Sequence, residues 1–142
     1  MELQTVDGMQ WAIRNRDLFF PRGKVDVIHL LAYVMSDVLE LGRGECRILQ
    51  RDAWWHVLSD KDWLAHPETS VRELFERVVP APAHGEHSMR AEVLLGAFAE
   101  DVFTSSDGRE LQVKGQAPDR AVIEGVLLGG WSRRLVAFRV GG

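Results

Sequence analysis

Three polar side chains share one face of a predicted apolar helix, and their chemistry suits a cation or a polar ligand. Apolar residues recur at helical spacing from residue 25 to residue 41, which predicts a helix with a wide buried face. Tyr33, Asp37 and Glu40 form a polar stripe on this helix, because positions three or four apart lie on nearly the same face. Carboxylate oxygens are good ligands for hard cations such as Mg²⁺. Asp37 and Glu40 are therefore candidate metal ligands.

An acidic turn follows the second of two short strand-like segments. Ser59, Asp60 and Asp62 come directly after residues 54–58. A helix that brings polar residues to the rim of a sheet, beside an acidic turn at a strand end, is a common arrangement for a small-ligand pocket. The sequence therefore predicts a pocket between helix 25–41 and this turn. Asp60 and Asp62 also suit a metal-binding pair, although a charged turn at a strand end is more commonly solvated.

Other residues with chemical potential carry weaker signals. His84 and His87 make an H-x-x-H pattern in a loop rich in proline, alanine and glycine, and zinc would need at least a third ligand, such as Glu86. No recognised zinc motif surrounds them, so solvated loop histidines are the favoured interpretation. The serines lack a G-x-S-x-G context, and the single cysteine, Cys46, has no histidine nearby in the sequence. Cys46 is interpreted as structural, and nucleophilic catalysis is not indicated.

Two adjacent tryptophans lie on one predicted strand. Because neighbouring residues of a strand point to opposite faces, Trp54 and Trp55 cannot both face the same layer of the core. Burial of both under helices is the favoured interpretation. The alternative is an exposed aromatic interaction patch that also includes Trp63, Phe19 and Phe20.

Length and composition are those of one soluble domain spanning residues 1–142. The chain is 46% hydrophobic and 27% charged, and no apolar run reaches the roughly 18 residues that a membrane span needs. The first residues lack the basic and apolar regions of a secretory signal, so we expect a cytoplasmic location and no membrane partner. The net charge is −4 and the basic residues are scattered, so nucleic acid is not the favoured partner.

Helical and strand patterns follow one another in an order typical of an α+β fold. A capping box at Ser70 and Glu73 marks the start of one short helix, and Asp-Gly at 107–108 marks a hairpin. We expect a two-layer sandwich with the helices on one face of a mixed, largely antiparallel sheet. Helices are predicted at 8–16, 25–41, 71–75 and 88–100, and strands at 46–50, 54–58, 101–105, 110–114, 122–128 and 134–140.

The order of these segments resembles the ATPase domain of the DNA gyrase B type, a member of the GHKL family. The resemblance covers nearly the whole chain and depends on collinearity, because each segment alone is a weak match. It implies a Bergerat-type fold, in which ATP and Mg²⁺ lie between the helices and a mixed sheet. Residues 12–20 resemble the family's "IRKRPGMY" entry segment, 29–42 its long helix, 48–64 its strand pair and "DNGRGIP" turn, 91–100 its "GASVVNALSE" helix, 101–114 the following hairpin, and 134–138 the closing strand.

The resemblance implies a role for each matching position. Tyr33 stands where the family has the glutamate that activates water, and a phenol with a pKa of about 10 is a poor general base at neutral pH. Asp37 replaces the asparagine that holds Mg²⁺. Ser59 or Asp60 matches the aspartate that reads adenine, and Arg134 replaces a threonine near the adenine. The implied nucleotide-pocket residues are thus Tyr33, Asp37, Ser59, Asp60, Asp62 and Arg134, and no residue is assigned a catalytic role.

The glycines that admit a nucleotide in this family are largely missing. Lys61, Asp62 and Trp63 stand where glycines allow the ligand to approach closely, and Trp63 would fill that space. The phosphate-binding lid is glycine-rich in the family because backbone N–H groups bind phosphate. Residues 84–91 keep one glycine, and Glu86 would repel a phosphate. The implied nucleotide site is therefore eroded.

Three hypotheses follow. The first is a non-catalytic GHKL-like binding or regulatory module that acts through contacts with a protein partner and needs no cofactor. The second is a Mg²⁺-dependent ATP-binding protein or slow ATPase, which uses Asp37 and Glu40 for the metal and Ser59 or Asp60 for adenine. The third is an unrelated α+β interaction protein, such as a toxin-neutralising immunity factor. The sequence carries no signal for the partner's identity or the oligomeric state.

Overall fold

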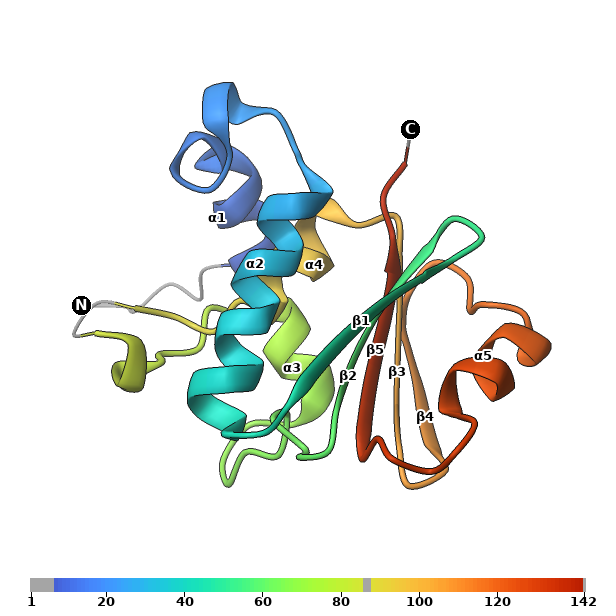
Figure 1. The fold of residues 1–142 in the computed structure, drawn as a ribbon. Helices are drawn as coiled ribbons and strands as arrows, with labels where there is room; N and C mark the ends of the chain where they lie inside the picture. Colours follow the sequence, from blue (N-terminus) through green and yellow to red (C-terminus); the bar gives the residue numbers. More distant parts are fainter. Residues whose placement is uncertain (1–6, 86–87, 142) are drawn as a thin grey trace.

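A five-stranded antiparallel sheet runs through the centre of the computed structural model, which describes residues 7–85 and 88–141 (Figure 1). The strand order is β1-β2-β5-β3-β4, and each of the four pairings is antiparallel. The closing strand β5 therefore lies between two hairpins, β1–β2 and β3–β4. The strands are β1 (Cys46–Arg51), β2 (Trp54–Ser59), β3 (Asp101–Ser106), β4 (Arg109–Lys114) and β5 (Arg134–Arg139).

Within residues 7–85 and 88–141, five α-helices accompany the sheet, which confirms the predicted α+β class. Side-chain caps mark three of their starts: Asp7, Asp26 and Ser70 each accept a hydrogen bond from a backbone N–H of the first turn. The predicted cap at Ser70 is present: its hydroxyl accepts from the Glu73 N–H and donates to the Glu73 carboxylate. The helices are α1 (Gly8–Arg14), α2 (Val27–Asp37), α3 (Val71–Glu76), α4 (Glu92–Phe98) and α5 (Arg120–Leu127), with single turns at Arg16–Leu18, Pro21–Gly23 and Pro82–His84.

The predicted helix 25–41 is α2 followed by a π-helical turn. This turn spans Val38–Gly42, and the chain leaves it through Arg43 in the left-handed conformation, with φ of 57°. A Cβ placed on Gly42 would lie 2.7 Å from the Cβ of Trp63, so glycine allows the acidic turn to pack directly against the end of the helix. Trp63 is only 2% exposed and belongs to the core.

The sheet has a hydrophobic cluster on each face. The larger cluster joins α1, α2, α3 and α4 to side chains such as Val57, Val136 and Phe138. Figure 1 shows these four helices together on one side of the sheet and α5 alone on the other. The smaller cluster packs Ile123 and Val126 of α5 against the sheet residues Trp54, Leu58, Phe103, Leu135 and Ala137.

Two expectations about this arrangement are wrong. Residues 122–128 were expected to form a strand, but most of them belong to α5. Ile123 and Val126 are three positions apart, and this helical spacing places both against the sheet. As a result the helices do not all lie on one face, and within the described residues the sheet has no parallel pairing.

The alternative of an exposed aromatic patch is wrong. Trp54 lies in the cluster under α5, and Trp55 packs against the larger cluster on the opposite face, which confirms that the two side chains diverge. Phe20 and Trp63 are buried, and Phe19 is half-buried. In the described part of the chain, each helix is too short or too polar to cross a membrane.

Candidate functional site

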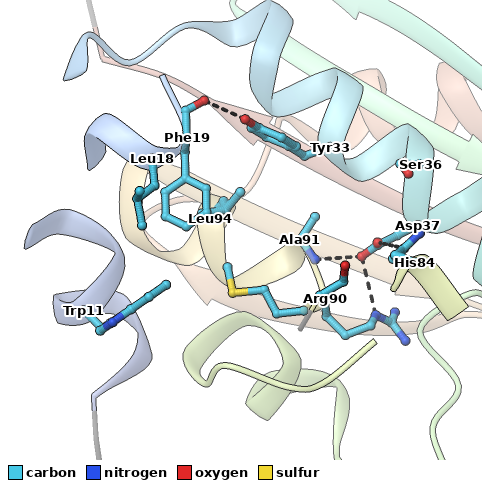
Figure 2. A pocket seen from close by; sticks show the side chains of 12 residues that line it. Trp11, Leu18, Phe19, Tyr33, Ser36, Asp37, His84, Arg90, Ala91 and Leu94 are labelled. Atoms are coloured by element: carbon cyan, nitrogen blue, oxygen red, sulfur yellow. Dashed lines mark hydrogen bonds and ion pairs between the residues drawn. The ribbon is translucent and has the colours of Figure 1, made fainter. Parts of the chain in front are cut away.

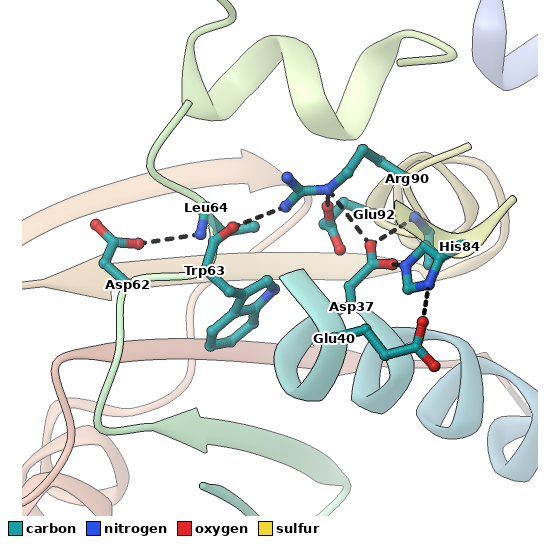
Figure 3. Close-up of polar contacts among 9 residues, drawn as sticks. Asp37, Glu40, Asp62, Trp63, Leu64, His84, Arg90 and Glu92 are labelled. Atoms are coloured by element: carbon teal, nitrogen blue, oxygen red, sulfur yellow. Dashed lines mark hydrogen bonds and ion pairs between the residues drawn. The ribbon is translucent and has the colours of Figure 1, made fainter. Parts of the chain in front are cut away.

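The buried carboxylate of Asp37 is the centre of a polar cluster at the C-terminal end of α2 (Figure 3). Asp37 is 1% exposed, and both of its oxygens have partners. Oδ1 lies 2.8 Å from Nε2 of His84, and Oδ2 accepts a hydrogen bond of 2.8 Å from the backbone N–H of Ala91. Ala91 precedes α4, which has no side-chain cap of its own. Asp37 therefore caps the positive end of α4 from a different helix.

Arg90 joins this carboxylate to two other elements. Its Nε donates to Oε1 of Glu92 at 2.8 Å and lies 3.4 Å from Oδ2 of Asp37. Its Nη2 donates to the backbone carbonyl of Trp63 at 2.9 Å. The guanidinium is buried, and charged hydrogen bonds in such an environment are strong because solvent does not screen them. Arg90 thus ties α2 and α4 to the turn that follows β2.

Glu92 is fully buried beside Arg90, with 0% exposure. Burial, followed by the nearby carboxylate of Asp37, holds the pKa of Glu92 well above its ordinary value, although Arg90 opposes the shift. Among the described residues, Oε2 of Glu92 has no hydrogen-bond partner. A protonated Glu92 leaves one carboxylate, Asp37, to balance the charge of Arg90.

His84 connects the loop after α3 to the end of α2. Its Nε2 contacts Asp37, and its Nδ1 makes a short contact with a carboxylate oxygen of Glu40. Burial lowers the pKa of His84, but the hydrogen bonds to Glu40 and Asp37 outweigh burial, so the net shift is upward. A protonated imidazole donates from both nitrogens and fits this position between two carboxylates.

The candidate metal ligands Asp37 and Glu40 both contact the side chain of His84. The His84 imidazole lies between Asp37 and Glu40, and in the described part of the chain no three or more such side chains are arranged to hold a metal ion. His84, which was expected to be solvated, is mostly buried, with 13% of its side chain exposed. His87 and Glu86, the other residues of the H-x-x-H hypothesis, lie outside the described residues.

The other sequence-predicted residues form a second polar group at the end of β2. Arg134 donates from Nε and Nη2 to the two oxygens of Asp62, at 2.8 and 3.0 Å, and from Nη1 to Thr104 at 3.2 Å. Ser59 is fully buried, and its hydroxyl accepts from the Lys61 N–H at 3.2 Å. These polar groups hold the turn against the sheet.

Asp60 has a similar role at the neighbouring loop. Its Oδ1 accepts a hydrogen bond of 2.8 Å from the backbone N–H of Glu45, just before β1. Asp62 instead accepts from Arg134 and from the Leu64 N–H. The two aspartates of the turn therefore serve different loops.

The six candidate pocket residues do not line a common pocket. Tyr33 and Asp37 line a cavity of about 340 Å³ beside α2, whereas Asp62 and Arg134 line a separate pocket of about 470 Å³ beside β4. Ser59 and Asp60 line neither of these two. Figure 3 shows Trp63 between Asp62 on one side and Asp37 on the other.

The cavity beside α2 is largely apolar (Figure 2). Trp11 and Phe19 pack edge to face, with ring centroids 5.9 Å apart, and Phe19 packs in the same way on Tyr33 at 6.3 Å. The Tyr33 hydroxyl donates to the backbone carbonyl of Phe19 at 2.7 Å, so it is already satisfied. Leu18, Met89 and Leu94 complete the apolar lining, and Ser36, Asp37, His84, Ser88 and Arg90 supply its polar groups.

Sequence reasoning missed Arg90 and Glu92 as members of the polar cluster. The available signal was Glu92, a charged residue inside an otherwise apolar helical run, which must have a partner if that run is buried. The predicted helix 88–100 begins only at Glu92, because Met89 forms an extended β-bridge with Pro80 and the Arg90 N–H donates to the Val79 carbonyl. That extended segment brings Arg90 to Asp37.

Comparisons with protein-family models, with curated proteins and with solved structures found no match to this chain.

Proposed function

We propose that this chain is a non-catalytic, GHKL-like binding module that acts through contacts with a protein partner. The observation that carries the proposal is that Asp37, the residue at the metal-binding position of the resemblance, is 1% exposed and fully hydrogen-bonded inside the protein. To bind Mg²⁺ it would have to release the Ala91 N–H and the His84 imidazole. Breaking a buried charged pair in this way is costly.

Three further contacts argue against ATP chemistry. Tyr33 uses its hydroxyl in a hydrogen bond to the Phe19 carbonyl, which makes it still less suited to act as a base. Arg134 donates hydrogen bonds to both carboxylate oxygens of Asp62. Trp63 fills the space beside Gly42 that an open turn would leave to a ligand. Side chains of the protein therefore occupy the positions at which a nucleotide would be recognised.

The outer face of α2 is evidence for a protein partner. Ile28, Ala32, Met35 and Leu39 follow one another at helical spacing and form a second apolar stripe, opposite the buried face. Ile28 is 65% exposed and Leu39 48% exposed. A surface helix normally carries polar residues on its outer face, so an apolar stripe there is typical of a protein-binding surface. We refer to these four residues as the α2 stripe.

The nucleotide half of the proposal is tested by calorimetric titration of the full chain with ATP, with and without Mg²⁺. We expect no saturable binding at millimolar nucleotide in either condition. Mg²⁺-dependent binding would support the alternative of an ATP-binding protein or slow ATPase and would overturn the proposal.

The protein-contact half is tested by site-specific photo-crosslinking in cells that produce the chain. A crosslinking residue at Ala32, within the α2 stripe, is compared with one at Glu124, which is exposed on α5. We expect a discrete crosslinked protein from position 32 only, and its loss when Leu39→Glu is added. Equal crosslinking from both positions, or none from position 32, would contradict a role for the α2 stripe.

A further inference from the structure

The cavity beside α2 has the size and lining of a small-molecule site. Its volume of about 340 Å³ lies near the lower end of the range of roughly 300 to 1,000 Å³ for ligand pockets. An apolar cavity of about 150 Å³ accommodates a single benzene ring. A cavity about twice as large therefore suits a molecule of about two fused rings.

Aromatic side chains form one wall of this cavity. Trp11, Phe19 and Tyr33 make two successive edge-to-face contacts, and this packing fixes the positions of their rings. Figure 2 shows Phe19 between Trp11 and Tyr33. Because the Tyr33 hydroxyl is bound to the Phe19 carbonyl, this wall offers ring surface rather than a polar group. Such a wall favours an aromatic ligand.

The charged groups at the polar end of the cavity already pair with one another. Asp37 and Glu40 are paired with His84, and Arg90 is paired with Glu92 and Asp37. These groups are engaged with one another, so a charged ligand would lose its hydration without gaining a counter-charge. By contrast, the hydroxyls of Ser36 and Ser88 make no side-chain hydrogen bond to any other described residue. They are available to a ligand as hydrogen-bonding groups.

We propose that this cavity binds a small, neutral aromatic molecule of about two rings that carries one hydroxyl or N–H group. The rings lie against Trp11, Phe19 and Tyr33, and the polar group bonds to Ser36 or Ser88. The site is distinct from the α2 stripe, because Ser36 lines the cavity whereas the stripe lies on the outer face of the helix. The proposal does not depend on the protein partner.

Titration of the full chain with 2-naphthol, followed by amide NMR shifts, tests this site. For a ligand of about eleven heavy atoms we expect a Kd of roughly 10 µM to 1 mM, with shifts concentrated at the cavity residues. The anionic analogue 2-naphthalenesulfonate is expected to bind at least about tenfold more weakly, because its charge has no partner in the cavity.

Variants locate the binding. Ser36→Phe places a ring in the cavity and is expected to weaken 2-naphthol binding at least about tenfold, whereas Ala32→Phe, on the exposed face of the same helix, leaves it unchanged. Ser88→Phe is a second blocking variant on a different segment, in case Ser36→Phe fails to fold. Absence of wild-type binding, equal binding of the sulfonate, or binding that survives both blocking variants would overturn the proposal.

Discussion

Replacement of Asp37 by alanine is expected to destabilise the ligand-free protein severely. The change removes the acceptor of the Ala91 N–H and one partner each of Arg90 and His84, at a site that is 1% exposed. Removing one partner from a buried charge pair costs about 3 to 5 kcal/mol. With an unfolding entropy of about 2.1 cal/mol/K per residue over 142 residues, that loss lowers Tm by about 10 to 17 °C.

Asp37→Asn is expected to lose less stability than Asp37→Ala. The amide oxygen can still accept from the Ala91 N–H, and the shape of the side chain is kept. Both variants also remove the Asp37 charge that helps to hold the pKa of Glu92 above its ordinary value, so in each of them Glu92 can ionise more readily and pair with Arg90. This second effect offsets part of the lost ion pair.

Thermal unfolding followed by circular dichroism measures these differences. Asp119→Ala is the matched control, because Asp119 is exposed and its side chain caps no backbone N–H, and its Tm is expected to stay within about 2 °C of wild type. If Asp37 were instead a ligand-binding carboxylate kept at the expense of stability, Asp37→Ala would be neutral or stabilising. A variant at least as stable as wild type would refute the structural role given to Asp37.

Two further predictions concern His84 and Gly96. The folded-state pKa of His84 is raised, so its contribution to the free energy of unfolding is fully present below the ordinary value of 6.5 and is lost as the pH rises through the folded pKa. The free energy of unfolding of wild type and of His84→Gln, from urea titrations at pH 6 and above, should therefore differ less as the pH rises. A difference that stays constant with pH would contradict this prediction. Gly96→Ala should destabilise the protein by at least about 1 to 3 kcal/mol, because the new Cβ would lie 1.9 Å from the Phe75 carbonyl oxygen. Gly125→Ala is the control: nothing lies within 4 Å of its new Cβ, so this variant should be neutral or stabilising in the same urea assay.

The local elements were largely predictable because their signals are local. The cap at Ser70 and the Asp-Gly turn at 107–108 act within a few residues, and the structure has them where the sequence indicates. Residues 122–128 are the exception, because a short apolar run fits a buried strand as well as a helix. Pro118 and Asp119, just before α5, were the overlooked signal of a helix start.

The polar cluster could be predicted only in part, because tertiary contacts assemble it. Asp37 and Glu40 were recognisable from their spacing on one helix. Their partners, His84 and Arg90, are about fifty residues away in the chain, and no local pattern indicates which charges meet after folding. Whether Asp37 faces a ligand or another side chain depends on the path of the segment before α4. That path is set by packing rather than by periodicity.

We infer that the protein's own side chains occupy the implied nucleotide site. An NMR titration of the isotopically labelled full chain with a non-hydrolysable ATP analogue tests it most directly, with and without Mg²⁺, because amide shifts report both binding and its location. We predict no saturable shift at Ala91, Trp63 or Leu135, which lie beside Asp37, Gly42 and Arg134, at analogue concentrations of several millimolar. Saturable, Mg²⁺-dependent shifts at these three amides would contradict the account.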